Sequence, residues 1–265
     1  MTTLKNFYIK NKIVIITGGA GLLGSTFTEA IAEIKGTPVI LDLDKKKSEK
    51  LCLNIYKNYK IKPLFIKTDI TNEVSLKKAC SIIIKKFKKI DVLINNAANN
   101  PKINKKNDSS FENFSLSNWQ KDIDVSLKGS FLCSKIFGKE MTKKKSGVII
   151  NISSDLGIIS PDQRLYSTLN KKPVSYSVVK HGIIGLTKYI ATYWSSEGIR
   201  SNTLCPGGIF DNQPDEFIMK IKNLIPLNRM ANRDEYKSAI QFLSSDASSY
   251  MNGASIVIDG GRSSW

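Results

Sequence analysis

The segment Thr17-Gly18-Gly19-Ala20-Gly21-Leu22-Leu23-Gly24 joins a short apolar run to a helical pattern. The run before it, residues 12–17, predicts a buried β-strand, and the apolar spacing after it predicts a helix over about residues 22–34. Glycines at such a junction let the backbone turn sharply and approach a phosphate, whose charge the amides of the helix N-terminus attract. Its place between strand and helix favours a pyrophosphate-binding loop over a simple tight turn.

Short β-branched runs alternate with longer helical patterns along the whole chain. This alternation is typical of a parallel sheet with crossover helices. Strands are expected at residues 12–17, 37–42, 64–68, 92–95, 148–153, 201–204 and 255–258. We therefore predict an α/β fold, a Rossmann-type doubly wound parallel sheet of about seven strands with helices on both faces, built by residues 1–265 as a single domain.

Composition and charge argue against several classes of function. The formal net charge is +17, but 35 of the 40 basic residues are Lys, five are Arg, and the Lys clusters are scattered. Nucleic-acid readers favour Arg on one face, so we expect no nucleic-acid partner. Four cysteines without a Cys-x-x-Cys pair and a single histidine give no pattern for a metal site. Without an apolar run of signal-peptide or membrane-spanning length, we expect a cytoplasmic protein with no membrane partner.

Asp42 ends the second expected strand, 18 residues after Gly24. A carboxylate at this place can accept hydrogen bonds from the adenosine ribose hydroxyls of NAD, and it would repel the 2′-phosphate of NADP. Leu43 is not basic, but Lys45 to Lys47 follow closely. NAD is therefore the expected cofactor and NADP the alternative. If Asp42 has no part in cofactor binding, it is an ordinary helix cap.

Two long helical patterns, over about residues 116–141 and 175–195, carry apolar residues around much of their circumference. A helix of this kind is either deeply buried or shared with a second subunit. We therefore predict a homo-oligomer, a homodimer or homotetramer, with burial inside the monomer as the alternative.

Further motifs resemble those of the classical short-chain dehydrogenase/reductase family over nearly the whole chain. Asp69-Ile70, Asn95-Asn96-Ala97-Ala98 and Pro206-Gly207-Gly208-Ile209 each follow an expected strand and are similar to the family's cofactor-binding elements. The resemblance implies hydride transfer between nicotinamide and a carbonyl or alcohol group. It implies cofactor contacts from Thr17, Gly18, Gly21, Leu22, Leu23, Gly24, Asp42, Asp69, Ile70, Asn95, Ala97, Lys180, Pro206, Gly207 and Ile209.

The family's catalytic Ser-Tyr-Lys set matches Ser154, Tyr176 and Lys180. The Tyr-x-x-x-Lys spacing is weak evidence alone, because copies that begin at Tyr8 and Tyr56 repeat it, but only the third copy follows a strand ending in Ser-Ser. Residues four apart share one helix face, so both side chains can point at the nicotinamide. The lysine and the oxidised nicotinamide favour the phenolate, so we expect Tyr176 to exchange protons with a lowered pKa while Ser154 holds the substrate oxygen.

The sequence departs from the family pattern in two places. Ser126 stands where the family has an additional catalytic asparagine, so the usual side chain of the proton relay is absent. The backbone carbonyl or the hydroxyl of Ser126 is the alternative group that could hold the relay's water. The segment between Ser154 and Tyr176 is unusually long, and we expect substrate-wall segments near residues 155–175 and 208–232. That long segment and the closing residues 259–265 resemble flagellin-modification dehydrogenases of nonulosonate (legionaminic-acid-type) sugar pathways, which implies a phosphorylated or nucleotide-linked sugar substrate.

Arg164 and Arg229 are the candidate anchors for an anionic small-molecule substrate, because Arg can hold a phosphate with two parallel hydrogen bonds. Ordinary surface arginines are the alternative. Two other functions stay open: a 3-oxoacyl or small-ketone reductase, and a non-catalytic dinucleotide-binding or redox-sensing protein. Asp42 weighs against the first, which usually uses NADPH, and the complete Ser-Tyr-Lys set weighs against the second.

Overall fold

The computed structural model describes residues 3–99, 109–166 and 171–265. Seven strands form one sheet in the order β3-β2-β1-β4-β5-β6-β7, and every neighbouring pair is parallel. The strands are β1 Ile13–Thr17, β2 Thr37–Asp42, β3 Leu64–Lys67, β4 Val92–Asn95, β5 Gly147–Ile152, β6 Ile199–Pro206 and β7 Ser255–Ile258. The α-helices are α1 Leu22–Glu33, α2 Lys45–Tyr59, α3 Glu73–Phe87, α4 Leu116–Asp122, α5 Gly129–Thr142, α6 Val174–Tyr193, α7 Asp215–Lys222 and α8 Lys237–Ser244. The predicted Rossmann-type fold is confirmed.

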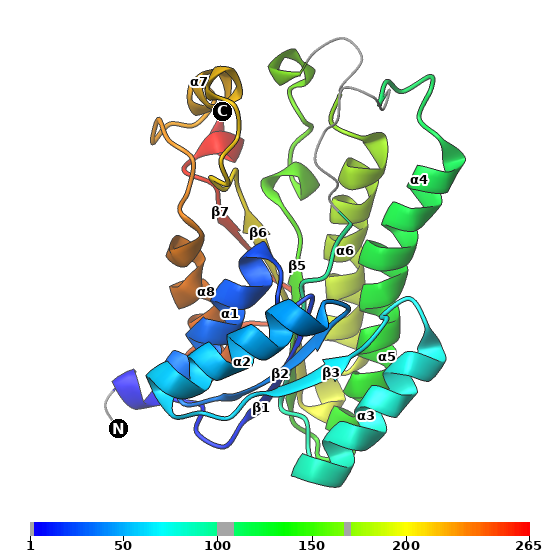
Figure 1. Cartoon of the computed structure of the whole chain (residues 1–265), viewed down its shortest axis with the longest axis vertical. Coiled ribbons are helices and arrows are strands. Elements are labelled where there is room, and N and C mark those ends of the chain that lie inside the picture. The colour runs from blue at the N-terminus through cyan, green and yellow to red at the C-terminus, as the bar shows by residue number, and fades with distance from the viewer. Residues whose placement is uncertain (1–2, 100–108, 167–170) are drawn as a thin grey trace.

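The sheet is buried on both faces, which explains why its central strands are continuous apolar runs. In β1, Ile13 and Ile15 pack into a cluster with α3, α5 and α6, whereas Val14 and Ile16 pack into a second cluster with α1 and α8. Figure 1 shows the same division, with α1, α2 and α8 on one face and α3, α5 and α6 on the other.

The strand order reverses direction at β1. Strands β2 and β3 extend to one side of it, and β4 to β7 extend to the other. In open parallel sheets, ligands bind in the crevice at the carboxyl ends of the strands where this reversal occurs. The glycine-rich segment follows β1 at that point, so the topology places it at the mouth of the crevice.

The long helical pattern expected at residues 116–141 is not one regular α-helix. A π-helical segment, Ile123–Lys128, separates α4 from α5. The expected pattern at residues 175–195 corresponds to α6, which is 20 residues long. Among the described residues, no helix is both apolar and long enough to cross a lipid bilayer.

The two segments expected to form a substrate wall pack against each other above the carboxyl ends of the strands. A third apolar cluster joins Leu165 to Ile221, Ile225 and Met230. Residues 167–170 of the expected wall lie outside the described part of the chain.

Candidate active site

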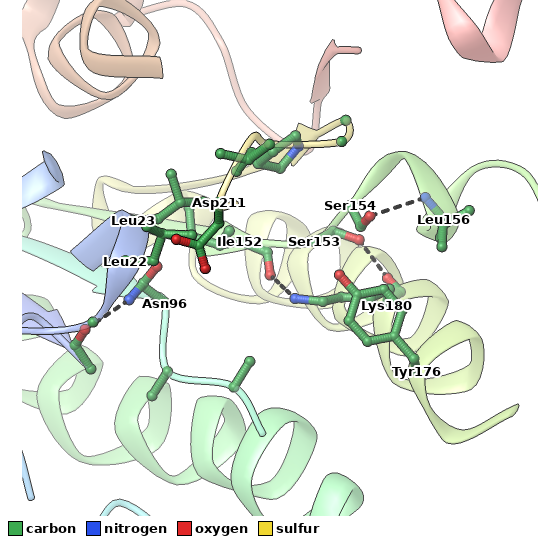
Figure 2. A pocket seen from close by; sticks show the side chains of 18 of the residues that line it. Leu22, Leu23, Asn96, Ile152, Ser153, Ser154, Leu156, Tyr176, Lys180 and Asp211 are labelled. Carbon is green, nitrogen blue, oxygen red and sulfur yellow. Dashed lines mark hydrogen bonds between the residues drawn. The ribbon is translucent and has the colours of Figure 1, made fainter. Parts of the chain in front are cut away.

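A cavity of about 990 Å³ occupies the crevice at the carboxyl ends of the strands. It extends from Asp42 at the end of β2, past the glycine-rich segment, to Ser154, Tyr176 and Lys180. Figure 2 shows the part where β5 and α6 meet the glycine-rich segment. One continuous cavity therefore joins the expected nucleotide-binding residues to the expected catalytic residues.

Two glycines of the segment after β1 cannot be replaced without displacing the backbone. Gly18 has a φ of +59°, and a Cβ there would lie 3.0 Å from the Cα of Ala97. A Cβ on Gly24 would lie 2.0 Å from the carbonyl oxygen of Gly18. Gly18 and Gly21 line the cavity together with Leu22 and Leu23, and the two glycines leave backbone without a side chain next to the space that a pyrophosphate would fill.

Thr17 and Asn95 support this wall from behind and do not line it. The Thr17 hydroxyl oxygen accepts hydrogen bonds from the amides of Asn96 and Ala97, each at 3.0 Å. The Asn95 side chain donates to Asn151 Oδ1 at 2.8 Å inside the sheet. Thr17 and Asn95 thus lie behind the lining, and their direct cofactor contacts stay a prediction.

Gly24 is likewise absent from the lining. Several lining residues were not foreseen, among them Asn96 and Ala98. The Asn96 side chain donates to the carbonyl oxygens of Thr17 at 2.9 Å and Gly18 at 3.1 Å, which fixes the glycine-rich segment to β4. The Asn-Asn-Ala-Ala sequence was a signal for this contact, but it did not say which asparagine faces the cavity.

The Asp42 carboxylate is held rigidly at the far end of the cavity. Its Oδ2 accepts from the Ala20 amide at 2.9 Å, and its Oδ1 accepts from the Asp44 amide at 2.9 Å. Lys45 pairs with Glu49, Lys47 pairs with Asp44, and none of Lys45 to Lys47 lines the cavity. The remaining expected contacts on these two sides also line the cavity. They are Asp69 and Ile70 after β3, Pro206 at the end of β6, and Gly207 and Ile209 after it.

Ser154, Tyr176 and Lys180 come together where β5 ends against α6 (Figure 2). Lys180 Nζ donates to the carbonyl oxygen of Ile152 at 3.0 Å and lies 5.5 Å from the centre of the Tyr176 ring. Ser153 Oγ donates to the backbone oxygen of Lys180 at 2.7 Å and so ties α6 to the strand end. The structure thus brings the three expected catalytic side chains to one wall.

The protein by itself does not lower the pKa of Tyr176. Burial raises it to about 12; the hydrogen bond with Ser154 is the next largest effect and lowers it, and the charge of Asp155 raises it by less. Burial also lowers the pKa of Lys180 to about 8, and the positive charge of Lys172 adds to that change. The lowered tyrosine pKa expected from the sequence is therefore absent here, because burial disfavours the charged form of both groups.

The two arginines expected to hold the substrate lie elsewhere. Arg164 is exposed and pairs with Asp162 at 2.7 Å, and Arg229 pairs with Glu235 at 2.7 Å. Neither lines the cavity, so this prediction is corrected. Each guanidinium faces solvent and binds a carboxylate that is close to it in the sequence.

Besides Lys180, the cationic side chains of Lys172 and Arg262 line the cavity near Tyr176 and Ser154. Lys172 Nζ lies 3.6 Å from the centre of the Tyr176 ring. Arg262 Nη1 lies 2.8 Å from Asp155 Oδ2, and both side chains are more than nine-tenths buried. Both residues stand in segments that the sequence marked as unusual, the long segment before Tyr176 and the closing residues.

Ser126 is buried on the π-helical segment and does not line the cavity, although its neighbour Val125 does. Its carbonyl oxygen accepts a hydrogen bond from Ser130 Oγ at 2.6 Å. The serine hydroxyl therefore does not take the place of the family's asparagine side chain in the cavity wall.

Known proteins with similar sequences and structures point to one family of enzymes. A family model described as enoyl-(acyl carrier protein) reductase matches residues 23–263. A D-threitol dehydrogenase of Mycolicibacterium smegmatis is 28% identical over 97% of this chain and 94% of its own. The post-translational flagellin modification protein A of Campylobacter coli is 29% identical over 96% and 98%, in agreement with the narrower resemblance.

A solved structure of a short-chain type dehydrogenase/reductase from Mycobacterium marinum superimposes with a TM-score of 0.88. It is 25% identical and covers 99% of each chain. The fold, the cavity and the extent of these matches lead to one conclusion: the chain belongs to the short-chain dehydrogenase/reductase family, oxidoreductases that bind a nicotinamide dinucleotide and act on alcohol or ketone substrates.

Proposed function

We propose that this protein catalyses NAD-dependent interconversion of a secondary alcohol and a ketone on a sugar-type substrate, with Tyr176 as the general acid and base. The observation that carries the proposal is the single cavity that joins Asp42 to Ser154, Tyr176 and Lys180. A non-catalytic dinucleotide-binding protein would have no need of these three side chains on one wall.

Bound nicotinamide would supply the hydride donor or acceptor. For oxidation, Tyr176 takes the proton of the substrate hydroxyl, and for reduction it returns a proton to the same oxygen. The Ser154 hydroxyl holds that oxygen by a hydrogen bond. In the free protein the Ser154 hydroxyl donates its one proton to Asp155 Oδ1 at 2.7 Å, so it must turn from Asp155 to donate to the substrate oxygen. The Lys180 ammonium donates to the backbone oxygen of Ile152, and the backbone oxygen of Lys180 accepts from Ser153. In this proposal Lys180 binds the nicotinamide ribose and favours the phenolate.

NAD is the proposed cofactor because of Asp42. Two backbone amides fix its carboxylate, so it cannot easily turn away from a ribose 2′-phosphate. Of the lysines that kept NADP as an alternative, Lys45 pairs with Glu49 and Lys47 pairs with Asp44. A ratio of kcat/KM that favours NAD over NADP by more than tenfold is expected, and a ratio near one would remove this proposal.

A phosphorylated or nucleotide-linked sugar is the proposed substrate, supported by the flagellin-modification relative and by the polyol named for the D-threitol relative. The second candidate is a 3-oxoacyl or small ketone. It is favoured by the description of the matching family model and by the apolar side chains of Leu165, Phe217, Ile221 and Met230 in the cavity wall.

One screen separates these functions. NADH absorbance is followed with polyols, sugar phosphates, nucleotide sugars and acetoacetyl thioesters, in the oxidising and the reducing direction. Turnover of the sugar-type compounds supports the proposal, and turnover confined to the thioesters supports the second candidate. NADH binding without turnover of any compound would favour a non-catalytic role.

A homo-oligomer is also proposed. Phe131 on α5 and Tyr189 and Tyr193 on α6 are exposed, and the two tyrosine rings stack at 5.5 Å between centres. Exposed aromatic side chains on neighbouring helices are typical of a subunit interface. Sedimentation equilibrium is expected to give a dimer or tetramer, and a monomer at micromolar concentration would contradict it. The cytoplasmic location stays a prediction from the sequence.

A further inference from the structure

Ser154 is the first member of a hydrogen-bonded series that leads away from the reacting end of the cavity. Its hydroxyl donates to Asp155 Oδ1 at 2.7 Å, and Arg262 Nη1 donates to Asp155 Oδ2 at 2.8 Å. The side chains of Asp155 and Arg262 are 3% and 6% exposed, and Ser154 is buried as well. A serine that the proposed function places on the substrate oxygen is thus tied, through one carboxylate, to the closing residues of the chain.

The turn that carries Arg262 is held on two sides. It follows β7, and Asp259 Oδ2 accepts a hydrogen bond from the Ser263 amide at 2.8 Å. At its other end, Trp265 Nε1 donates to the carbonyl oxygen of Leu224 at 3.2 Å, in the segment after α7. Figure 1 shows this end of the chain beside α7. The backbone of Arg262 therefore has a fixed place from which the side chain reaches the buried carboxylate.

The Ser154 hydroxyl has one proton and cannot donate it to Asp155 and to a substrate oxygen at once. Rotation about the Cβ–Oγ bond moves the proton and leaves the oxygen in place, where it accepts from the Leu156 amide at 3.2 Å (Figure 2). The strength with which Asp155 holds the proton therefore sets the free energy needed to turn it toward the substrate. Hydrogen bonds to a charged acceptor are about twice as strong as neutral ones, so this free energy depends on how far the charge of Asp155 is compensated.

Arg262 makes the turn of the serine easier in two ways. Its positive charge compensates the negative charge of the carboxylate, which weakens the attraction of Asp155 for the serine proton. It also keeps Oδ2 of Asp155 hydrogen-bonded, while the Leu156 amide donates to Oδ1 at 2.8 Å. Asp155 therefore keeps a donor on each oxygen after Ser154 has turned away, as a buried carboxylate requires.

We propose that Arg262 is a positioning residue for the reaction: by holding Asp155, it frees the Ser154 hydroxyl to donate to the substrate oxygen. This inference rests on the proposed function, which assigns that donation to Ser154. The effect of Arg262 is greatest in the transition state of ketone reduction, because negative charge then develops on the oxygen that Ser154 contacts. A direct contact between substrate and Arg262, which also lines the cavity, is the competing role.

A double-mutant cycle of Arg262→Met and Ser154→Ala separates the two roles. The probes are D-threitol with NAD and acetoacetyl-CoA with NADH, one from each candidate class of substrate. With the probe that is turned over, Arg262→Met is expected to lower kcat by about tenfold or more, and KM for the cofactor should stay within about threefold. In the Ser154→Ala background the same substitution should have no further effect. An equal loss of kcat in both backgrounds would contradict the proposal, because a direct contact or a general loss of structure does not depend on Ser154.

Arg229→Met is the matched control, because Arg229 also binds a carboxylate but does not line the cavity, and it should leave kcat unchanged. Each variant is assayed well below its Tm, with its folded state checked by circular dichroism. Where Arg262→Met alone does not fold, its combination with Asp155→Asn removes both charges. A neutral amide oxygen holds the serine proton less strongly than a carboxylate, so this double variant should keep kcat within about tenfold of wild type. A larger loss would contradict the proposal.

A binding measurement keeps the test independent of turnover. Isobutyramide has a carbonyl oxygen that accepts hydrogen bonds as a ketone does, but NADH does not reduce it. In isothermal titration into NADH-saturated protein, Arg262→Met should weaken its binding by about tenfold, with no further weakening in the Ser154→Ala background. This result supports the role of Arg262 even where neither probe is turned over and the proposed function fails. No binding to the wild-type protein, or an equal loss in both backgrounds, would overturn it.

Discussion

The buried pair of Arg262 and Asp155 predicts a large loss of stability when one member is removed. Their side chains are 6% and 3% exposed, and the pair joins the end of the chain to the segment after β5. Replacing Arg262 by Met leaves a buried carboxylate without its cation, which typically costs about 3 to 5 kcal/mol. Asp155 keeps its bonds from Ser154 and Leu156, so we expect the lower end, about 3 kcal/mol. At about 2 to 4 °C per kcal/mol, Tm should fall by about 6 to 12 °C.

The assay is urea unfolding followed by circular dichroism at one fixed protein concentration, for the two single variants and the double variant. Asp155→Asn with Arg262→Met removes both charges and should recover a large part of the loss, because neither charge is left unpaired. Arg229→Met is the control: it breaks an exposed pair with Glu235 and should change stability little. The reasoning fails if Arg262→Met is no more destabilising than the control, or if the double variant is less stable than both single variants.

Three further predictions concern the catalytic and cofactor residues. Tyr176→Phe should reduce kcat by about 100-fold or more while NADH still binds in a fluorescence titration; turnover within tenfold of wild type would refute its role. Asp42→Ala should shift the ratio of kcat/KM toward NADP, and an unchanged ratio would show that another residue selects the cofactor. Because the pKa values of Lys172 and Lys180 are about 8 in the folded protein and about 10.5 when unfolded, the unfolded chain binds more protons between these values. The unfolding free energy should therefore rise from pH 8 to pH 9, and less in Lys172→Gln. Above pH 9 the buried thiols of Cys80, Cys133 and Cys205, whose pKa values burial raises, act in the opposite direction. An equal rise in both proteins between pH 8 and pH 9 would contradict the burial of Lys172.

The fold could be predicted because its determinants are local. Strands buried on both faces need unbroken apolar runs, and Gly24 is required by its contact with Gly18, six residues earlier. Three strands, β2, β4 and β7, have the predicted bounds. The break between α4 and α5 was missed, because Ile123–Lys128 contains no glycine or proline that would mark it in the sequence.

The substrate side of the site could be predicted only in part, because tertiary packing decides it. Arg164 was a plausible anchor by residue type, yet Asp162, two residues away, binds it at the surface. Arg262 reaches the cavity through a partner that is 107 residues away in sequence. No local pattern reports such a contact. Lys172 lies in the irregular segment before α6, so its approach to the Tyr176 ring also depends on packing and not on helical spacing.

The spacing of Lys172, Tyr176 and Lys180 also bears on how the tyrosine becomes acidic. Burial raises the pKa of Tyr176 and lowers the pKa of both lysines, so the free protein favours the neutral phenol and opposes the two neighbouring charges. Oxidised nicotinamide carries a positive charge, which would favour the phenolate when the cofactor fills the cavity. On this argument Tyr176 gains its acidity from the bound cofactor, and its pKa in the complex with NAD should lie below its pKa in the free protein.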